Sequence, residues 1–394
     1  MDVKQWLFGV SLVFYLVGCG PTESRTRFEF HESSAQCQSQ VVKNQYLVQK
    51  YTGEISVERS LEGLTGVLQA EPNYRITIDN NVLPSAVTEN GLWGIENVEA
   101  ESLWNQNIFG SDVLVAVIDS GVELNHDQIR SRIAVNDKEF KGALGIDDDG
   151  NGKIDDAYGW NFASNQADVN DLMGHGTHVA GIILAEHTDD EFFPKGLAPR
   201  AKLIPISFID RSGGGYISDA IFSLDYAKSR GAKVVNASWG GAACSVFLRE
   251  KIQALASAGI LFVSAAGNDG VNVDKFLQFP ASFNLENQIT VGSIDSNNAM
   301  SKFSNFGSLN VHLMAPGADI LSTYLGSSNS VMSGTSMSTP FVVGAAALLW
   351  SARPTASYLQ IKQALLSSVT KVQYPVSSRG RLNLPQALSY LMTH

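Results

Sequence analysis

The stretch Ser333–Trp350, SGTSMSTPFVVGAAALLW, places hydroxyl residues and a proline directly before an unbroken apolar run. Gly334 permits a tight turn, Pro340 suits the first turn of a helix, and the apolar run predicts a buried helix. Ser336 is expected at the start of this helix, where unpaired backbone N–H groups favour nearby negative charge. That position suits a nucleophile, but an ordinary serine-rich helix cap explains this stretch equally well.

Composition sets the class of protein. At 394 residues, with 44% hydrophobic and 17% charged residues, the chain has the composition of a globular protein. Its net charge of -11, without a block of lysine and arginine, argues against nucleic acid as the main partner. Beyond the N-terminal segment, no stretch reaches the roughly 18 apolar residues that a membrane-spanning helix needs.

The N-terminus has the features of a targeting segment. Residues 6–17, WLFGVSLVFYLV, form a short apolar run that is followed by small residues, which is typical of a signal peptide rather than a membrane span. The stretch LVGC, Leu16–Cys19, resembles the lipobox of bacterial lipoproteins. This resemblance implies a signal peptide in residues 1–18 and lipidation of Cys19. We therefore expect a lipid-anchored protein of the cell envelope that faces outside the cytoplasm, with plain secretion as the alternative.

The three cysteines agree with this location without deciding it. If Cys19 carries lipid, Cys37 and Cys244 remain, and an oxidising compartment would allow them to form a disulfide. A free buried thiol is an equal alternative.

Three regions follow the signal peptide. Residues 19–42 are polar and are interpreted as a tether. In residues 43–82, NQYLVQKY and YRITI predict strands around a short helical stretch near Ser56–Leu64. A unit of this size is at the limit of independent stability. Residues 83–394 form the main domain.

Within the main domain, apolar strands alternate with helical segments, in the order DVLVAVID, AKLIPISFI, ISDAIFSLDYAKSRG, AKVVNASW, EKIQALASAG, ILFVSAAG and ITVGSID. This alternation predicts an α/β fold of three layers, with a mainly parallel central sheet flanked by helices. In such folds, functional groups gather at the carboxyl ends of the strands.

Two polar residues stand where catalysis would need them. Asp119 ends the strand of DVLVAVIDSGV, although a lone aspartate there is more often an ordinary loop residue. His175 lies between two glycines in MGHGTHVAGII and suits a general base. His178, three residues later, would allow a metal pair, but neither an HExxH motif nor a nearby cysteine supports zinc. We expect His178 to pack structurally.

The segments VIDSGV, GHGTHVAG and GTSMSTP contain an aspartate, a histidine and a serine in that order. Together they resemble the subtilisin-like serine proteases, over residues 91–391. The resemblance implies that Ser336 attacks the peptide carbonyl, that His175 transfers its proton, and that Asp119 orients the imidazole. The segment FVSAAGND is similar to the family's AAGN, which implies that Asn268 donates a hydrogen bond to the oxyanion together with the backbone N–H of Ser336.

The resemblance extends to two segments, SGGGY and ASWGG, that in this family hold an extended peptide as an added strand. Trp239 stands where the family usually has a smaller aliphatic residue, and small residues beside the primary pocket favour a broad, apolar preference. The predicted substrate-binding residues are Gly213, Gly214, Gly215, Ser238, Trp239, Gly240, Ala265, Ala266 and Gly267.

A second signal lies between Asp119 and His175. The stretch GIDDDGNGKIDDAYGWNF has the alternating oxygen-bearing residues of an EF-hand-like loop, which suits calcium. Tyr158 replaces the bidentate glutamate at the twelfth position, so the loop is not an EF-hand. A solvated acidic turn is the alternative, although its five aspartates would repel one another. The predicted ligands are Asp147, Asp149, Asn151, the Lys153 carbonyl, and Asp155 or Asp156.

The upstream unit gains a meaning from the same resemblance. VLQAEPNYRI, residues 67–76, resembles the end of a subtilase propeptide, which blocks the cleft until it is cut, but the unit is shorter than a full propeptide. The sequence therefore predicts a monomeric, lipid-anchored, calcium-stabilised endopeptidase that cleaves protein or peptide substrates through an acyl-enzyme. The alternatives are a serine esterase and a non-catalytic surface binding protein on the same fold.

Overall fold

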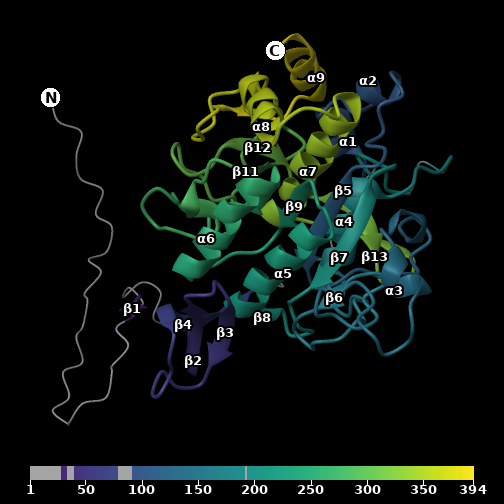
Figure 1. Ribbon diagram of the computed structural model, residues 1–394. Helices are drawn as coiled ribbons and strands as arrows, with labels where there is room; N and C mark the ends of the chain where they lie inside the picture. The colour runs from purple at the N-terminus through teal and green to yellow at the C-terminus, as the bar shows by residue number, and fades with distance from the viewer. Residues whose placement is uncertain (1–27, 33–39, 79–90, 191–192) are drawn as a thin grey trace, which may run out of the picture.

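The computed structural model describes residues 28–32, 40–78, 91–190 and 193–394 (Figure 1). The predicted signal peptide, Cys19 and Cys37 lie outside these ranges. Among the helices inside them, none combines the length and the apolar character that a bilayer crossing requires. We call residues 28–32 and 40–78 the N-terminal unit, and residues 91–190 and 193–394 the body.

The body is built on a sheet whose strand order is β15-β16-β12-β11-β10-β9-β5-β7-β6. Neighbouring strands are parallel, except that β15 and β16 are antiparallel. The strands are β5 (Leu114–Asp119), β6 (Trp160–Asn161), β7 (Lys202–Ser207), β9 (Val234–Ala237), β10 (Leu261–Ala265), β11 (Gln288–Ile294), β12 (Leu313–Pro316), β15 (Thr370–Lys371) and β16 (Gly380–Arg381).

Helices cover both faces of this sheet. Successive residues of a strand face opposite sides, so Val115 and Val117 of β5 join one apolar core, whereas Ala116 and Ile118 join the other. The first core contains α4 and α7, and the second contains α5 and α6 (Figure 1). The predicted three-layer α/β fold is therefore confirmed. The helices are α1 (Trp93–Asn97), α2 (Glu101–Trp104), α3 (Asp137–Lys141), α4 (His175–Leu184), α5 (Ile217–Ser229), α6 (Val246–Leu255), α7 (Thr335–Ala352), α8 (Tyr358–Ser367) and α9 (Leu384–Thr393).

The helix expected after Gly334 is α7, and it is buried through Trp350. Its first residue is Thr335, so Pro340 lies in the second turn. The prediction that Pro340 lies in the first turn is therefore wrong. A hairpin of β13 (Ile320–Tyr324) and β14 (Ser328–Met332) precedes α7 and packs on α4.

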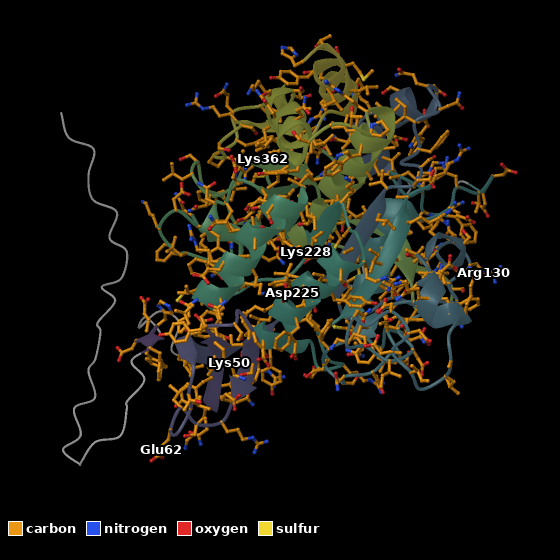
Figure 2. The ribbon with its side chains drawn as sticks, viewed as in Figure 1. Lys50, Glu62, Arg130, Asp225, Lys228 and Lys362 are labelled. Atoms are coloured by element: carbon orange, nitrogen blue, oxygen red, sulfur yellow. The ribbon has the colours of Figure 1, made fainter. Side chains whose placement is uncertain are left out.

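The N-terminal unit is a sheet centred on β4 (Val67–Thr77), which is antiparallel to β2 (Val41–Lys50) and parallel to β1 (Glu29–Phe30). The helix expected near Ser56–Leu64 is wrong, because Ile55–Glu58 instead form β3, which pairs with β2. Glycines with positive φ on both sides of β3 also disfavour a helix there. Part of the predicted tether belongs to this sheet, since β1 lies within it. Glu62, labelled in Figure 2, lies at the end of the unit that points away from the body.

Two side chains of β4 cap helices of the body. Glu71 is fully buried and accepts hydrogen bonds from the Ser245 hydroxyl and the Val246 N–H at the start of α6. Asn73 accepts a hydrogen bond from the Ser218 N–H in the first turn of α5. These contacts satisfy N–H groups that a helix leaves unpaired at its start. Burial raises the pKa of Glu71 to about 8, against the opposing effect of its hydrogen bonds.

Cys244 directly precedes Ser245, the N-cap residue of α6, and it is disulfide-bonded. The alternative of a free thiol at this position is therefore wrong.

Candidate active site

The three predicted triad residues come from three different elements of the body. Asp119 is the last residue of β5, His175 is the first residue of α4, and Ser336 is the second residue of α7. Their exposed fractions are 0%, 1% and 6%. His175 Nδ1 donates a 2.7 Å hydrogen bond to Asp119 Oδ1, which leaves Nε2 as the nitrogen that can accept a proton.

The charge environment of His175 favours its protonated form. Burial lowers the pKa of His175, but the adjacent Asp119 carboxylate and the more distant Asp171 outweigh burial and raise it above its ordinary value. Nε2 is buried and has no hydrogen-bond partner within the described residues. A general base needs such an open nitrogen that can receive a proton and hold it for a short time.

Ser336 is fixed by two hydrogen bonds to Ser238, which follows β9. The Ser336 hydroxyl donates to the Ser238 carbonyl at 3.1 Å, and the Ser238 hydroxyl donates to the Ser336 carbonyl at 2.8 Å. A helical carbonyl normally accepts from the N–H four residues later, but for Ser336 that residue is Pro340, which has no N–H. The proline therefore leaves the Ser336 carbonyl open for Ser238.

Asn268 follows β10 and lies beside the start of α7. Its amide oxygen accepts hydrogen bonds from both the N–H and the hydroxyl of Thr335, at 2.9 Å each. Because the oxygen is held in this way, the amide NH2 group remains available as a donor. Asn268 and Ser336 both line the same cavity, so the predicted oxyanion residue lies next to the predicted nucleophile.

Asp171 is a functional residue that the sequence did not reveal. Its buried carboxylate accepts hydrogen bonds from the N–H groups of Met173, Gly174 and Thr177, and from the hydroxyls of Thr177 and Ser120. It thus fixes the turn that presents His175 and joins this turn to the loop after Asp119. An acidic residue just before a helix start was the available signal, because carboxylates cap helix N-termini.

The glycines predicted to hold a peptide already hold a strand. Gly214–Tyr216 form β8, which pairs antiparallel with the end of β4, and Gly213 accepts a hydrogen bond from the Ile78 N–H at 2.8 Å. A Cβ at Gly214 would lie 2.2 Å from the Arg75 guanidinium, and one at Gly215 would lie 2.8 Å from a backbone oxygen. The oxygen beside Gly215 belongs to Phe208, which follows β7, so a side chain at Gly215 would press on the body, whereas the flexible Arg75 side chain could move away from one at Gly214.

A cavity of about 260 Å³ lies where β4 ends. Its lining includes most of the predicted substrate-binding residues, namely Ser238, Trp239, Gly240, Ala265, Ala266 and Gly267, together with Ile76, Thr77 and Ile78 of the N-terminal unit. The Trp239 indole is 3% exposed and donates to the Ile118 carbonyl, so most of the ring belongs to the core rather than to the pocket wall.

The acidic loop brings together a different set of carboxylates from the predicted one. Oxygen atoms of Glu139, Asp149 and Asp156 lie within 4.8 Å of one another. Asp147 instead accepts the N–H groups of Gly150, Asn151 and Gly152, and Asp155 accepts the N–H of Gly145. These backbone donors relieve much of the repulsion expected among the aspartates.

The remaining predicted ligands have other partners as well. Asn151 donates to both Asp149 and Asp156, and its side-chain oxygen accepts the Lys153 N–H at 2.8 Å. Glu139 was missed because it lies eight residues before Asp147 in the sequence, outside the spacing of the loop motif. It accepts the N–H groups of Asp149 and Asp155, so it belongs to the loop in space.

The donor set at this cluster fits a hard cation. Carboxylate oxygens are the ligands that calcium prefers, and burial raises the pKa of Asp156, which a nearby cation would oppose. Two other groups already contact Asp156 Oδ2. The Tyr226 hydroxyl donates a hydrogen bond to this oxygen, and Arg230 Nη1 lies 3.6 Å from it.

Comparison with known proteins gives one consistent family. A family model described as the subtilase family matches residues 110–381. The chain is 32% identical to the thermophilic serine proteinase of Bacillus sp. (strain AK1), over 89% of this chain and 79% of that protein. It is 33% identical to subtilisin Savinase of Lederbergia lenta, over 71% and 91%. It is 32% identical to the alkaline protease of Alkalihalobacillus alcalophilus, over 81% and 74%.

Asp171→Asn tests the role of the Asp171 charge. We expect the pKa of His175 to fall, because one of the two carboxylates that raise it becomes neutral. We also expect the free energy of unfolding to drop by about 1–3 kcal/mol, since part of a buried hydrogen-bond network is lost. The pKa is measured by NMR titration of the imidazole, with the exposed Asp168→Asn as control. An equal pKa in parent and Asp171→Asn would contradict the electrostatic role.

Proposed function

We infer the catalytic function from two facts. This chain belongs to the subtilase family, and the protein is a serine endopeptidase with protein or peptide substrates. We propose that Ser336, His175 and Asp119 catalyse peptide-bond hydrolysis through an acyl-enzyme. The observation that carries this assignment is the buried 2.7 Å hydrogen bond between Asp119 and His175, which leaves Nε2 without a hydrogen-bond partner and able to accept a proton.

The proposed reaction begins with a rotation of the Ser336 hydroxyl from the Ser238 carbonyl to His175 Nε2. Oγ attacks the substrate carbonyl while its proton moves to Nε2, and the resulting imidazolium then gives the proton to the leaving amine. Asp119 holds the tautomer with the proton on Nδ1 and stabilises the cation. Water repeats the sequence to release the acyl group.

The proposed oxyanion site consists of the Asn268 amide and the Ser336 N–H. Thr335 supports it, because its N–H and hydroxyl hold the amide oxygen and fix the direction of the NH2 group. A preorganised donor stabilises the developing charge without reorganising, and in subtilisin the loss of one such donor costs about 10²–10³ in kcat.

The pairing of β8 favours peptides over simple esters as substrates. Its edge accepts an extended backbone in register, with Ile76 opposite Gly215 and Thr77 opposite Gly214. An ester without a peptide backbone would make none of these bonds. The same pairing supports the proposal that the N-terminal unit inhibits the enzyme, since β4 occupies the strand edge that a substrate needs. The processing site then falls within residues 79–90, between this strand and the body.

We also propose that Cys19 carries a lipid and that the enzyme faces outside the cytoplasm in the cell envelope. The lipobox-like LVGC supports this location. Calcium is proposed at the cluster of Glu139, Asp149 and Asp156, where it would neutralise converging carboxylates and stabilise the loop.

Ser336→Ala should lower kcat for casein hydrolysis by about 10⁶-fold while the protein stays folded, because the nucleophile is removed. Hydrolysis is followed by release of soluble peptides, and folding by circular dichroism. Ser333→Ala, three residues away, is the matched control and should keep the parent rate. Casein digestion at the parent rate by Ser336→Ala would refute the assignment.

Cys19→Ala should abolish metabolic labelling with a palmitate analogue and move the protein from the membrane fraction to the soluble fraction. Cys37→Ala is the control and should keep its label. Equal labelling of the Cys19→Ala protein would exclude lipidation at this residue and leave plain secretion.

The calcium proposal is tested on the Ser336→Ala protein, which cannot digest itself. We expect a higher melting temperature in calcium than in EGTA, because a cation that binds only the folded state at 100-fold saturation adds about 2.7 kcal/mol. Asp149→Asn should lose most of the rise. Asp148→Asn, an exposed neighbour outside the cluster, should retain it. The same melting temperature in calcium and EGTA would identify the loop as a solvated acidic turn.

A further inference from the structure

We propose that the edge of β8 carries a binding site for a cationic side chain, formed by Asp210, Gly214 and Tyr216. It selects substrates that have arginine or lysine in the place of Arg75. This preference rests on the proposed function, in which a substrate replaces β4 on β8.

The Arg75 side chain shows how the site holds a cation. Arg75 of β4 pairs with Tyr216 of β8, and its guanidinium carbon lies 5.8 Å from the centre of the Tyr216 ring. Arg75 Nη2 lies 3.6 Å from Asp210 Oδ2 and donates to the Ser212 hydroxyl at 3.4 Å. A carboxylate, a hydroxyl and an aromatic ring of the body thus contact one guanidinium, which is the chemistry that recognises arginine.

Gly214 gives this guanidinium its place on the strand. A Cβ at Gly214 would lie 2.2 Å from Arg75 Nη2, so the guanidinium packs directly on the backbone of β8. The Arg75 side chain could avoid such a Cβ only by leaving its present position beside Asp210. The glycine therefore keeps open the surface on which the cation lies.

The anionic group of the site is fixed by the body alone. Asp210 Oδ1 accepts hydrogen bonds from the Ser212 N–H at 2.8 Å, from the Gly214 N–H at 3.1 Å and from the Ser212 hydroxyl. The Asp210 N–H donates to the Gly214 carbonyl at 2.7 Å and closes the same turn. Oδ2 is left to face the cation. Because these partners all belong to the body, the carboxylate keeps its direction when β4 leaves β8.

Asp210 is negatively charged at neutral pH. Burial would raise the pKa of Asp210, but its hydrogen bonds with Ser212 and Gly214, together with the charge of Arg75, outweigh burial and lower the pKa below its ordinary value. Within the described part of the chain, Arg75 is the only cation that forms an ion pair with Asp210. Removal of β4 therefore leaves a negative charge without its counter-ion beside the strand edge.

The direction of β4 places this site upstream of the bond to be cut. Ile76, Thr77 and Ile78, which follow Arg75, line the cavity that also contains Ser336. A substrate that replaces β4 and reaches Ser336 runs in the same direction. The cation site therefore binds a residue on the amino-terminal side of the cleaved bond, with at least three residues, the counterparts of 76–78, in between.

The expected preference is modest, because the site is open to solvent. The side chains of Arg75 and Asp210 are 44% and 45% exposed, and exposed ion pairs are weak. With the added contact to the Tyr216 ring, we expect arginine to raise kcat/KM by about 3- to 10-fold over a neutral side chain. Lysine keeps the charge but lacks the planar group, so its effect should be smaller.

Two peptides test this preference on the processed parent protein. One has the sequence of residues 72–90, PNYRITIDNNVLPSAVTEN, between a fluorophore and a quencher, and the other has glutamine in place of the arginine. The arginine peptide should have the higher kcat/KM, through a lower KM at equal kcat. The difference should shrink at high salt, because salt screens exposed charges.

Asp210→Asn should bring the ratio of the two kcat/KM values to about 1, because the amide keeps an oxygen for the turn but loses the charge. Asp225→Asn is the matched control. It removes an exposed charge of α5 that pairs with Lys251, and it should keep the parent ratio. If Asp210→Asn does not fold, the salt dependence of the parent ratio tests the same charge.

Hydrogen exchange tests the pair without hydrolysis, on the full-length Ser336→Ala protein. The Ile78 N–H, which donates to the Gly213 carbonyl, reports the opening of β4 from β8. Arg75→Gln and Asp210→Asn should each raise its exchange rate by about 3-fold. The double variant should exchange no faster than either single variant, since both changes remove the same interaction.

The outcomes separate this site from the proposed function. Equal kcat/KM values for the two peptides in the parent, at low and at high salt, would overturn the cation site and leave the proposed function intact. Additive effects of the two substitutions on exchange would also overturn the site. A parent that cleaves neither peptide would refute the proposed function, together with the substrate preference that rests on it.

Discussion

The position of Ser336, the proposed nucleophile, depends on an N–H group that Pro340 does not have. Without that donor, the Ser336 carbonyl is open to the Ser238 hydroxyl, and the second residue of α7 is tied to the end of β9. In return, the Ser336 hydroxyl donates a hydrogen bond to the Ser238 carbonyl. A helix start and a strand end are thereby locked together at the edge where β5 also delivers Asp119. The other parts of the site are arranged around this junction.

The second fixed point is the buried carboxylate pair beside His175. Asp119 contacts the imidazole directly, and Asp171 holds the turn that presents it while also adding to its negative surroundings. Two buried carboxylates are costly unless their oxygens are paired, and here backbone N–H groups and hydroxyls of the same turn provide most of the partners. Rigid orientation and charge stabilisation thus come from one hydrogen-bond network.

The sequence predicted what is local and missed what is assembled from distant segments. The positions of Asp119, His175 and Ser336 at a strand end or a helix start could be predicted, because each lies in a short motif with a clear turn. Asp171 and Glu139 were missed, because their partners come from loops that only the folded chain brings close. The helix near Ser56–Leu64 was wrong for a similar reason: β2 offers that segment a strand partner, and pairing outweighs local propensity.

The glycine-rich strand β8 also affects whether folded copies of the protein associate with one another. In the proposed function, the edge of β8 accepts many peptide sequences, so charged or bulky side chains cannot protect it without also excluding the substrate. Such an open edge can pair with any exposed strand, including one from another copy of the protein. By covering this edge from within the same chain, β4 shields the folded molecule from such pairing between copies.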